Sequence, residues 1–192
     1  MEQALVFKIK ENFASLKLRA DRSRSCQLRG LFSPASAQRV EGLYKDAVAK
    51  GAKVLVGEPG FDGAVVQPLL LGNVTPEMDI LFNETFGPVH SLVTFDKPEE
   101  IMPHINDNPE AGLSASIYGA NETECWMLSE QIESGAVHIN GPTIHDHGAV
   151  PHGGVKLSGF GRFNGAEGIR AHTWQKVVTV SPPYALPLEH IL

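Results

Sequence analysis

The arrangement of apolar and polar positions predicts two helices in the first quarter of the chain. In residues 2–18 the apolar positions recur at three- and four-residue steps, which is the spacing of one helical face. These positions are Leu5, Ile9, Phe13 and Leu16. The polar, arginine-rich residues that follow are predicted to form a loop.

The second helix is the clearest element, and it is predicted to run from Ser33 to Gly51. Ser33 is a favoured residue type for a helix N-cap, and Pro34 suits the first helical position because no N–H is needed there. Gly51 is a favoured residue for the end of a helix. The apolar face consists of Val40, Leu43, Tyr44 and Ala47.

Short apolar runs predict strands along the rest of the chain. They lie at 53–57, 64–74, 90–95, 113–119, 136–140 and 173–180, the fifth being expected to be buried. Pro68 indicates an edge or a bulge in the second run. Between the strands, a helix starts at residue 97 and meets Pro103 after about one turn, and residues 122–134 form a helix that ends at Gly135.

This alternation predicts an α/β fold, with an open, mostly parallel twisted sheet and flanking helices. The chain has 192 residues, a net charge of −6 and a pI of about 5.7, which suits one globular domain and makes nucleic acid and anionic membranes poor partners. No apolar run reaches the roughly 18 residues of a membrane span. Cys26 and Cys125 are too few for a disulfide framework, so we expect a reducing, cytoplasmic location.

The stretch "NETFGPVH" is the first candidate site. Glu84 is able to accept both hydroxyls of a ribose, and Phe86 is able to pack on a flat ring. The alternative is a strand that ends in a Phe-Gly-Pro turn with its ring in the core. On these residues alone, the turn is favoured.

The loop "NGPTIHDHGAVPHGG" is the second candidate, because it concentrates His145, Asp146, His147 and His152. A carboxylate beside imidazoles supports general acid–base chemistry near neutral pH. A zinc site is not expected, since the loop has no cysteine, no helical pair of histidines and no clear third ligand. A polar surface loop is the alternative.

The segment 153–165 is rich in glycine, and glycine-rich loops can hold phosphate with their backbone N–H groups. The Walker A spacing is absent, so a winding loop whose backbone packs closely is favoured. Cys125, within a predicted helix, is expected to be structural. Cys26 lies among arginines that would activate a thiol, although an incidental cysteine is the favoured interpretation.

The order of these segments carries more information than any one of them. "NETFGPV", "GLSASIYG", "SGAVHINGPTIHD", "PHGGVKLSGFGRFNGAEGI" and "TWQKVVTV" together resemble the C-terminal, catalytic half of the aldehyde dehydrogenase superfamily. The resemblance extends from about Leu5 to about Val180. The sequences "HINGPTIHD" and "PHGGVK" are most similar to those of the branch that acts on aromatic aldehydes, such as salicylaldehyde and vanillin dehydrogenases.

The resemblance implies a role for several residues. Glu84 corresponds to the glutamate that holds the nicotinamide ribose, and Phe86 to a residue near the nicotinamide. Asn140 corresponds to an asparagine beside the active site, and residues 141–147, with Thr143 among them, to the loop at the substrate entrance. Residues 1–172 would then form a catalytic domain, and 173–192 an oligomerisation strand and tail.

The resemblance also implies absences. In the family, the catalytic cysteine precedes the helix matched by residues 2–18, and the general base and the Rossmann-like domain lie further upstream. Neither Cys26 nor Cys125 stands at the nucleophile's place. We therefore expect a truncated domain that supplies part of the pocket wall and binds no cofactor by itself, NAD(P) being held only if a partner supplies the missing domain.

Three hypotheses follow. The first is a repurposed enzyme that performs non-redox acid–base chemistry (isomerisation, dehydration, cyclisation or hydrolysis) on a small hydrophobic, aromatic or polyketide-like substrate. Its catalytic candidates are His147, His152, His145, Asp146 and Glu84, and its pocket candidates are Phe86, Asn140 and Thr143. The second is a fragment of an NAD(P)-dependent aldehyde oxidoreductase that needs a partner chain. The third is a non-catalytic oligomer. We also expect self-association through 173–180, at least to a dimer, although a stable oligomer of this chain alone would count against the second hypothesis.

Overall fold

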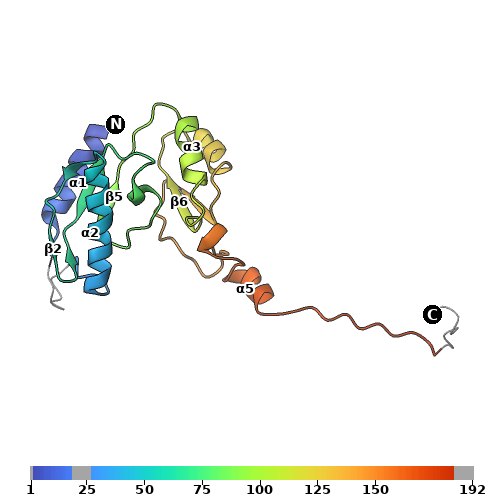
Figure 1. Ribbon diagram of the computed structural model, residues 1–192. Coiled ribbons are helices and arrows are strands. Elements are labelled where there is room, and N and C mark those ends of the chain that lie inside the picture. Colours follow the sequence, from blue (N-terminus) through green and yellow to red (C-terminus); the bar gives the residue numbers. More distant parts are fainter. Residues whose placement is uncertain (1, 19–26, 184–192) are drawn as a thin grey trace, which may run out of the picture.

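The computed structural model describes residues 2–18 and 27–183, so the arginine-rich loop and Cys26 lie outside the described residues. The chain forms two groups of elements that lie side by side, followed by an extended tail (Figure 1). The first group contains α1 (Glu2–Ser15), α2 (Pro34–Ala49), β1 (Lys53–Val56), β2 (Phe61–Asp62), β3 (Val65–Val66), β4 (Leu69–Gly72), η1 (Asp79–Leu81) and β5 (Val89–Ser91). The second contains α3 (Pro98–Asn106), β6 (Ser114–Ile117), α4 (Glu122–Ser129), β7 (Ala136–Ile139), η2 (Lys156–Ser158) and α5 (Gly165–Ala171).

Helix α2 begins and ends as its sequence predicts. The Ser33 hydroxyl accepts a hydrogen bond from the backbone N–H of Ser36 at 3.1 Å, and Pro34 is the first helical residue. Gly51 follows the helix with a φ of 105°, a conformation that glycine adopts without steric cost. Val40 and Ala47 are fully buried, which confirms the predicted apolar face.

The sheet of the first group has the order β1-β4-β5. Strand β4 lies in its centre, and all four of its residues are buried. It pairs with β5 in parallel and with β1 in antiparallel orientation, while β2 and β3 form a separate hairpin. Pro68 separates β3 from β4 within the predicted run 64–74, because proline has no N–H to donate to a ladder.

The second group has its own two-stranded parallel sheet of β6 and β7. The α/β class is therefore confirmed, with parallel pairing in both groups, although the strands form three small sheets. Strand β7 was expected to be buried, but its residues are only half-buried. The reason is that a two-stranded sheet has few neighbours, and α4 is the helix in contact with β7.

The hydrophobic core belongs to the first group of elements. It joins α2 to the central strand and to the segment before η1, and its most deeply buried side chains are Leu69, Leu71, Met78, Val40, Val66 and Val89. Helix α1 contacts β1 from outside, and none of its residues is fully buried. The loop that precedes β5 is thus attached to the most rigid part of the molecule.

Two helices differ in length from their predictions. Helix α3 continues through Pro103 to Asn106, because a proline in the second turn removes only the bond to the carbonyl of Glu99, which is exposed to water. Helix α4 ends at Ser129 and not before Gly135. The Asn106 side chain donates to the carbonyl of Gln131 and accepts from the N–H of Glu133, and these bonds hold the chain outside a helical path.

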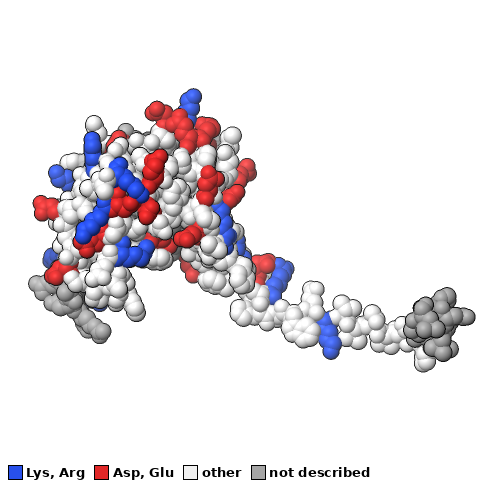
Figure 2. All heavy atoms as spheres, viewed as in Figure 1, with Lys and Arg blue, Asp and Glu red and all other residues white. Residues whose placement is uncertain are grey.

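The predicted strand at 173–180 is not formed in the single chain. The residues after α5 extend away from both groups of elements (Figure 1), and their side chains are exposed. A strand requires a neighbour for its backbone N–H and C=O groups, and none of the described residues provides one. Figure 2 shows charged side chains spread over the body and an almost uncharged tail. No described helix is long and apolar enough to cross a membrane.

Candidate functional site

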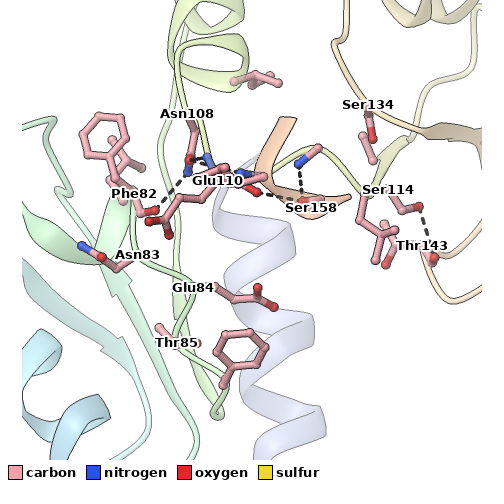
Figure 3. Close-up of a pocket in the computed structure, with 18 of the residues that line it drawn as sticks. Phe82, Asn83, Glu84, Thr85, Asn108, Glu110, Ser114, Ser134, Thr143 and Ser158 are labelled. Atoms are coloured by element: carbon pink, nitrogen blue, oxygen red, sulfur yellow. Dashed lines mark hydrogen bonds between the residues drawn. The ribbon is translucent and has the colours of Figure 1, made fainter. Parts of the chain in front are cut away.

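An open cavity of about 1250 Å³ lies between the two groups of elements. One wall comes from α2, η1, β5 and the loop between η1 and β5, and the other from the chain around β6 and η2. Several apolar side chains line the cavity and are exposed to it: Phe86, Ile105, Leu113, Ile144 and Leu157. Polar groups from both walls accompany them (Figure 3). The cavity thus suits a small ligand with an apolar ring and a few polar substituents.

The loop with Glu84 and Phe86 forms the rim of this cavity. Glu84 is exposed, and its side chain extends away from its own backbone into the open space (Figure 3). Phe86 has 72% of its surface exposed and a φ of 47°, so its ring is not in the core. The interpretation of this stretch as a turn with a buried ring is therefore wrong, because the left-handed backbone at Phe86 directs the ring outward.

Arg39 connects this loop to helix α2. Its Nη2 atom donates to the backbone carbonyls of both Glu84 and Thr85, each at 2.7 Å. Its guanidinium carbon lies 5.7 Å from the centre of the Phe86 ring. No property of the sequence pattern distinguished Arg39 from the other exposed residues of α2, and its role was missed.

His152 and Asp146 meet at the opposite side of the cavity. The Asp146 Oδ1 atom lies 3.8 Å from His152 Nδ1 and accepts a hydrogen bond from Asn164 Nδ2 at 2.8 Å. His152 lines the cavity, and its ring packs against Phe163 at a centroid distance of 4.9 Å. Of the loop's histidines, His152 is the one that the structure combines with a carboxylate and with the cavity.

His145 and His147 do not line the cavity. The ring of His145 lies 5.6 Å from that of His138 on β7. His147 Nδ1 accepts a hydrogen bond from the N–H of Ala149 at 3.2 Å, which occupies one of its two ring nitrogens. Both side chains are exposed. Within the described part of the chain, no three His, Cys, Asp or Glu side chains are grouped closely enough to hold a metal ion.

The two further pocket candidates have different positions. Thr143 lines the cavity, and its carbonyl accepts a hydrogen bond from the Ser114 hydroxyl at 3.2 Å. Asn140 lies at the end of β7, where its amide donates to the Gly119 carbonyl and accepts from the Gly119 N–H, both at 3.0 Å. It joins the ends of β6 and β7 and does not reach the cavity lining.

Cys125 and the glycine-rich segment have structural positions. Cys125 is buried on α4, so close to Gly119 that a β-carbon there would lie 2.7 Å from its Sγ atom. In the segment 153–165, a β-carbon at Gly153 would lie 2.6 Å from the carbonyl oxygen of Gly161, which confirms the close backbone packing. The Lys156 ammonium bonds to the Asn106 carbonyl and to Glu133, and is not directed at a phosphate site.

His90 is a cavity residue to which the sequence analysis assigned no role. It lies on β5, immediately after the Phe-Gly-Pro-Val motif, and it lines the cavity as an exposed residue. Partial desolvation lowers the pKa of His90 below its ordinary value, so the neutral imidazole is favoured at pH 7. The position of His90 directly after this motif was the sequence signal that could have identified it as a cavity residue.

The fold and the cavity thus define an α/β protein with an open cavity that is rimmed by a carboxylate and an aromatic ring. A protein-family model described as "Aldehyde dehydrogenase family" matches residues 1–178. The chain belongs to the aldehyde dehydrogenase family.

The relatives include enzymes named for aromatic aldehydes. Vanillin dehydrogenase of Pseudomonas sp. strain HR199 is 38% identical over 177 residues, which cover 92% of this chain and 36% of that protein. Salicylaldehyde dehydrogenase of Pseudomonas putida is 36% identical over 157 residues, which cover 82% of this chain and 32% of that protein. The chain therefore spans about a third of the length of these curated relatives.

Solved structures agree with this assignment. A salicylaldehyde dehydrogenase from Pseudomonas putida G7, crystallised with salicylaldehyde, superimposes with a TM-score of 0.88 at 33% identity, over 97% of this chain and 38% of that chain. An aldehyde dehydrogenase from Bacillus cereus in complex with NAD+ gives a TM-score of 0.78 at 28% identity, over 87% of this chain and 34% of that chain.

Proposed function

We propose that this chain forms one wall of an active site that oxidises aromatic aldehydes, with the nucleophile and the dinucleotide-binding domain contributed by further polypeptide. One observation carries the proposal: in a chain of this family, Glu84 and Phe86 stand exposed on the rim of an open cavity lined by apolar side chains. This proposal replaces non-redox chemistry as the leading hypothesis, because it explains the rim and the apolar lining together.

The overall reaction removes a hydride from the aldehyde carbon and adds an oxygen atom from water. Aldehyde, water and NAD(P)+ give carboxylate, NAD(P)H and two protons. The apolar side chains of this chain, such as Leu113 and Ile144, would hold the aromatic ring of the substrate by excluding water from it. The names of the relatives, which refer to vanillin and salicylaldehyde, support this substrate class.

The rim residues fit one end of a dinucleotide. No hydrogen bond or ion pair occupies the Glu84 carboxylate among the described residues, and a free carboxylate is suited to accept two ribose hydroxyls. The exposed ring of Phe86, held at a positive φ, is placed to pack against a flat ring. When bound, the dinucleotide would accept the hydride, and these two residues would orient it.

The described cavity has no sulfur nucleophile. Cys125 is buried behind Gly119 and does not line the cavity. Because thiolate chemistry needs an accessible sulfur at the aldehyde carbon, the nucleophile is expected from polypeptide that this chain does not contribute. This polypeptide is either a further part of the same protein or a second chain.

A chimera tests the proposal. In it, this chain replaces the matching third of Pseudomonas vanillin dehydrogenase, and NADH formation with vanillin is followed by absorbance. We expect turnover, and we expect Glu84→Gln to weaken NAD+ binding roughly tenfold through the loss of a charged acceptor. Exposed Glu99→Gln is the matched control. A folded chimera without turnover, or one in which Glu84→Gln has no effect, would refute the proposal.

A second candidate function is non-redox acid–base chemistry by the chain alone. The specific observation in its favour is the 3.8 Å approach of Asp146 to His152, which lines the cavity. The two groups are not hydrogen-bonded at this distance, but a carboxylate that bonds to Nδ1 would orient the imidazole and leave Nε2 for proton transfer with a ligand. His145, His147 and Glu84 stay secondary candidates for this chemistry, with Phe86 and Thr143 in the pocket.

The second candidate is tested on the purified chain with aromatic esters and hydroxybenzaldehydes, product formation being followed by chromatography. Turnover that His152→Gln and Asp146→Asn abolish would support it, with His104→Ala as the control because His104 is exposed on α3 and does not line the cavity. If both cavity variants retain the full rate, or if the chain turns over none of these compounds, this candidate is removed.

A further inference from the structure

The segment 84–86 has little support from its own backbone. Phe86 has a positive φ, which costs a residue with a β-carbon about 1–3 kcal/mol, and its large ring is exposed to water. The Thr85 hydroxyl donates to the carbonyl of Gly87 at 3.1 Å and to that of Val89, the first residue of β5, at 3.3 Å. These bonds stabilise the turn and tie it to β5, but neither reaches α2.

Helix α2 provides the attachment through two adjacent residues. Val40, which is fully buried, packs so closely under Gly87 that a β-carbon there would lie 3.0 Å from its Cγ2 atom. Arg39 extends along the surface and donates from Nη2 to the two carbonyls that precede Phe86. The same guanidinium lies over the Phe86 ring, where a cation is attracted to the negative face.

The Arg39 guanidinium donates to backbone carbonyls and does not pair with the neighbouring carboxylate of Glu84. No ion pair joins Arg39 to Glu84. The guanidinium therefore fixes the backbone from which Glu84 projects, while its carboxylate stays available in the cavity (Figure 3). One side chain thereby contacts both the backbone that carries the acid and the ring on the rim.

We propose that Arg39 is a positioning residue that holds the segment 84–86 in a conformation ready to bind the ribose–nicotinamide end of a dinucleotide. This inference rests on the proposed function of Glu84 and Phe86. Arg39 itself contacts neither substrate nor dinucleotide in this scheme and acts through the two rim residues. Preorganisation of a binding loop raises affinity because its ordering entropy is not lost on binding.

The first test needs no dinucleotide. Chymotrypsin cleaves after aromatic residues, and cutting after Phe86 requires the loop to detach from α2. We expect Arg39→Ala to raise the rate of this cut in the 192-residue chain roughly tenfold, as the loss of a charged hydrogen bond predicts, and Arg39→Lys to raise it less. Arg170→Ala, at an arginine paired with Glu167 on α5, is the control. Equal cutting of the Arg39→Ala and Arg170→Ala chains overturns the inference.

The second test uses the chimera and a double-mutant cycle on NAD+ binding. We expect Arg39→Ala to raise the Kd for NAD+ about tenfold and to leave the KM for vanillin within about twofold, with partial rescue by Arg39→Lys. In the Glu84→Gln background, the effect of Arg39→Ala should become clearly smaller, since Glu84 is one of the two rim residues through which Arg39 acts. Full additivity overturns the positioning role.

Failure of the proposed function and failure of the inference on Arg39 give different results. If the unsubstituted chimera folds but binds no NAD+, the proposed function fails, while chymotrypsin still shows whether Arg39 holds the loop. If the chimera binds NAD+ and Glu84→Gln weakens the binding, but Arg39→Ala changes neither binding nor proteolysis, the proposed function stands and this inference fails.

Discussion

A β-carbon at Gly57 would lie 2.2 Å from the carbonyl oxygen of Pro68, and Gly57 itself has a φ of 92°. The glycine is therefore required by both its backbone conformation and its neighbour. Gly42, in the exposed middle of α2, has no heavy atom within 4 Å of the same position. The two glycines show that the same residue type is essential in one place and costly in another.

We predict opposite effects for alanine at these two positions. Gly57→Ala should lower the free energy of unfolding by about 3 kcal/mol or more, because strain and overlap add. Gly42→Ala should raise it by about 0.5–1 kcal/mol through helix propensity. Urea unfolding monitored by circular dichroism measures both. A Gly57→Ala protein as stable as the parent would contradict the close approach to Pro68.

His90 makes stability depend on pH. Its folded-state pKa is lowered by desolvation, so between that value and the ordinary value of about 6.5 the unfolded chain binds more protons than the folded chain. The free energy of unfolding should therefore rise with pH across this window. Above it the group is neutral in both states, and its contribution no longer changes.

The measurement is the midpoint of thermal unfolding at several pH values between about 5 and 8, a range that includes the ordinary histidine pKa of about 6.5. His90→Gln should reduce the loss of stability on acidification, while the same change at His104, an exposed residue on α3, should retain it. If the pH dependence of the His90→Gln protein matched that of the parent, His90 would not be the group responsible.

At the level of elements, the bounds of α2 follow from residues close together in sequence, and α2 also supplies Arg39, which bonds to the rim of the cavity. Its cap and its apolar stripe were predictable because they depend on neighbours in sequence. The lengths of α3 and α4 were not, since Pro103 is accommodated by solvent and the end of α4 is determined by the Asn106 side chain, 25 residues distant from Gln131.

The N-cap of α2 provides a prediction at this scale. Ser33→Ala should lower the free energy of unfolding by about 1 kcal/mol, because the N–H of Ser36 loses its acceptor. Ser33→Asp restores an acceptor and should retain most of the stability. Denaturant unfolding compares the three proteins. An alanine variant as stable as the aspartate variant would show that the cap contributes nothing.

At the scale of the whole molecule, residues 173–180 of the extended tail have no neighbour among the described residues of the single chain. Trp174, Val177, Val178 and Val180 are each more than 70% exposed. Apolar residues in extended backbone with unpaired N–H and C=O groups form an edge that pairs with another strand. We propose that the tail joins copies of this chain, as the self-association hypothesis expected.

Light scattering tests this proposal. We expect a mass of at least twice the 20.8 kDa of the chain, and a shift toward the monomer when Val178 and Val180 are both replaced by lysine. Val150→Lys, an equivalent change in a loop of the body, should leave the mass unchanged. A monomeric parent chain would contradict the role of the tail.

The candidate site was predictable in part. Glu84, Phe86, Thr143 and His152 were named from the sequence, and all four line the cavity. Their motifs are short and local, so they are recognisable without a fold. Arg39 was missed because an arginine on a helix surface acquires a role only through its contacts with residues distant in sequence. His90 was missed because a histidine on a short strand acquires a role only from the cavity wall that it lines.

The sequence by itself determined the family, the α/β class, helix α2 with its cap and stop, and the motifs on the cavity rim, because each depends on residue types at close spacing. Only the tertiary structure decided that the Phe86 ring is exposed, that His152 and not His147 lines the cavity, and that Arg39 donates to the carbonyls of Glu84 and Thr85. The rim contact of Arg39 with Glu84 joins residues 45 positions apart, and residue spacing along the chain does not encode such a distance in space.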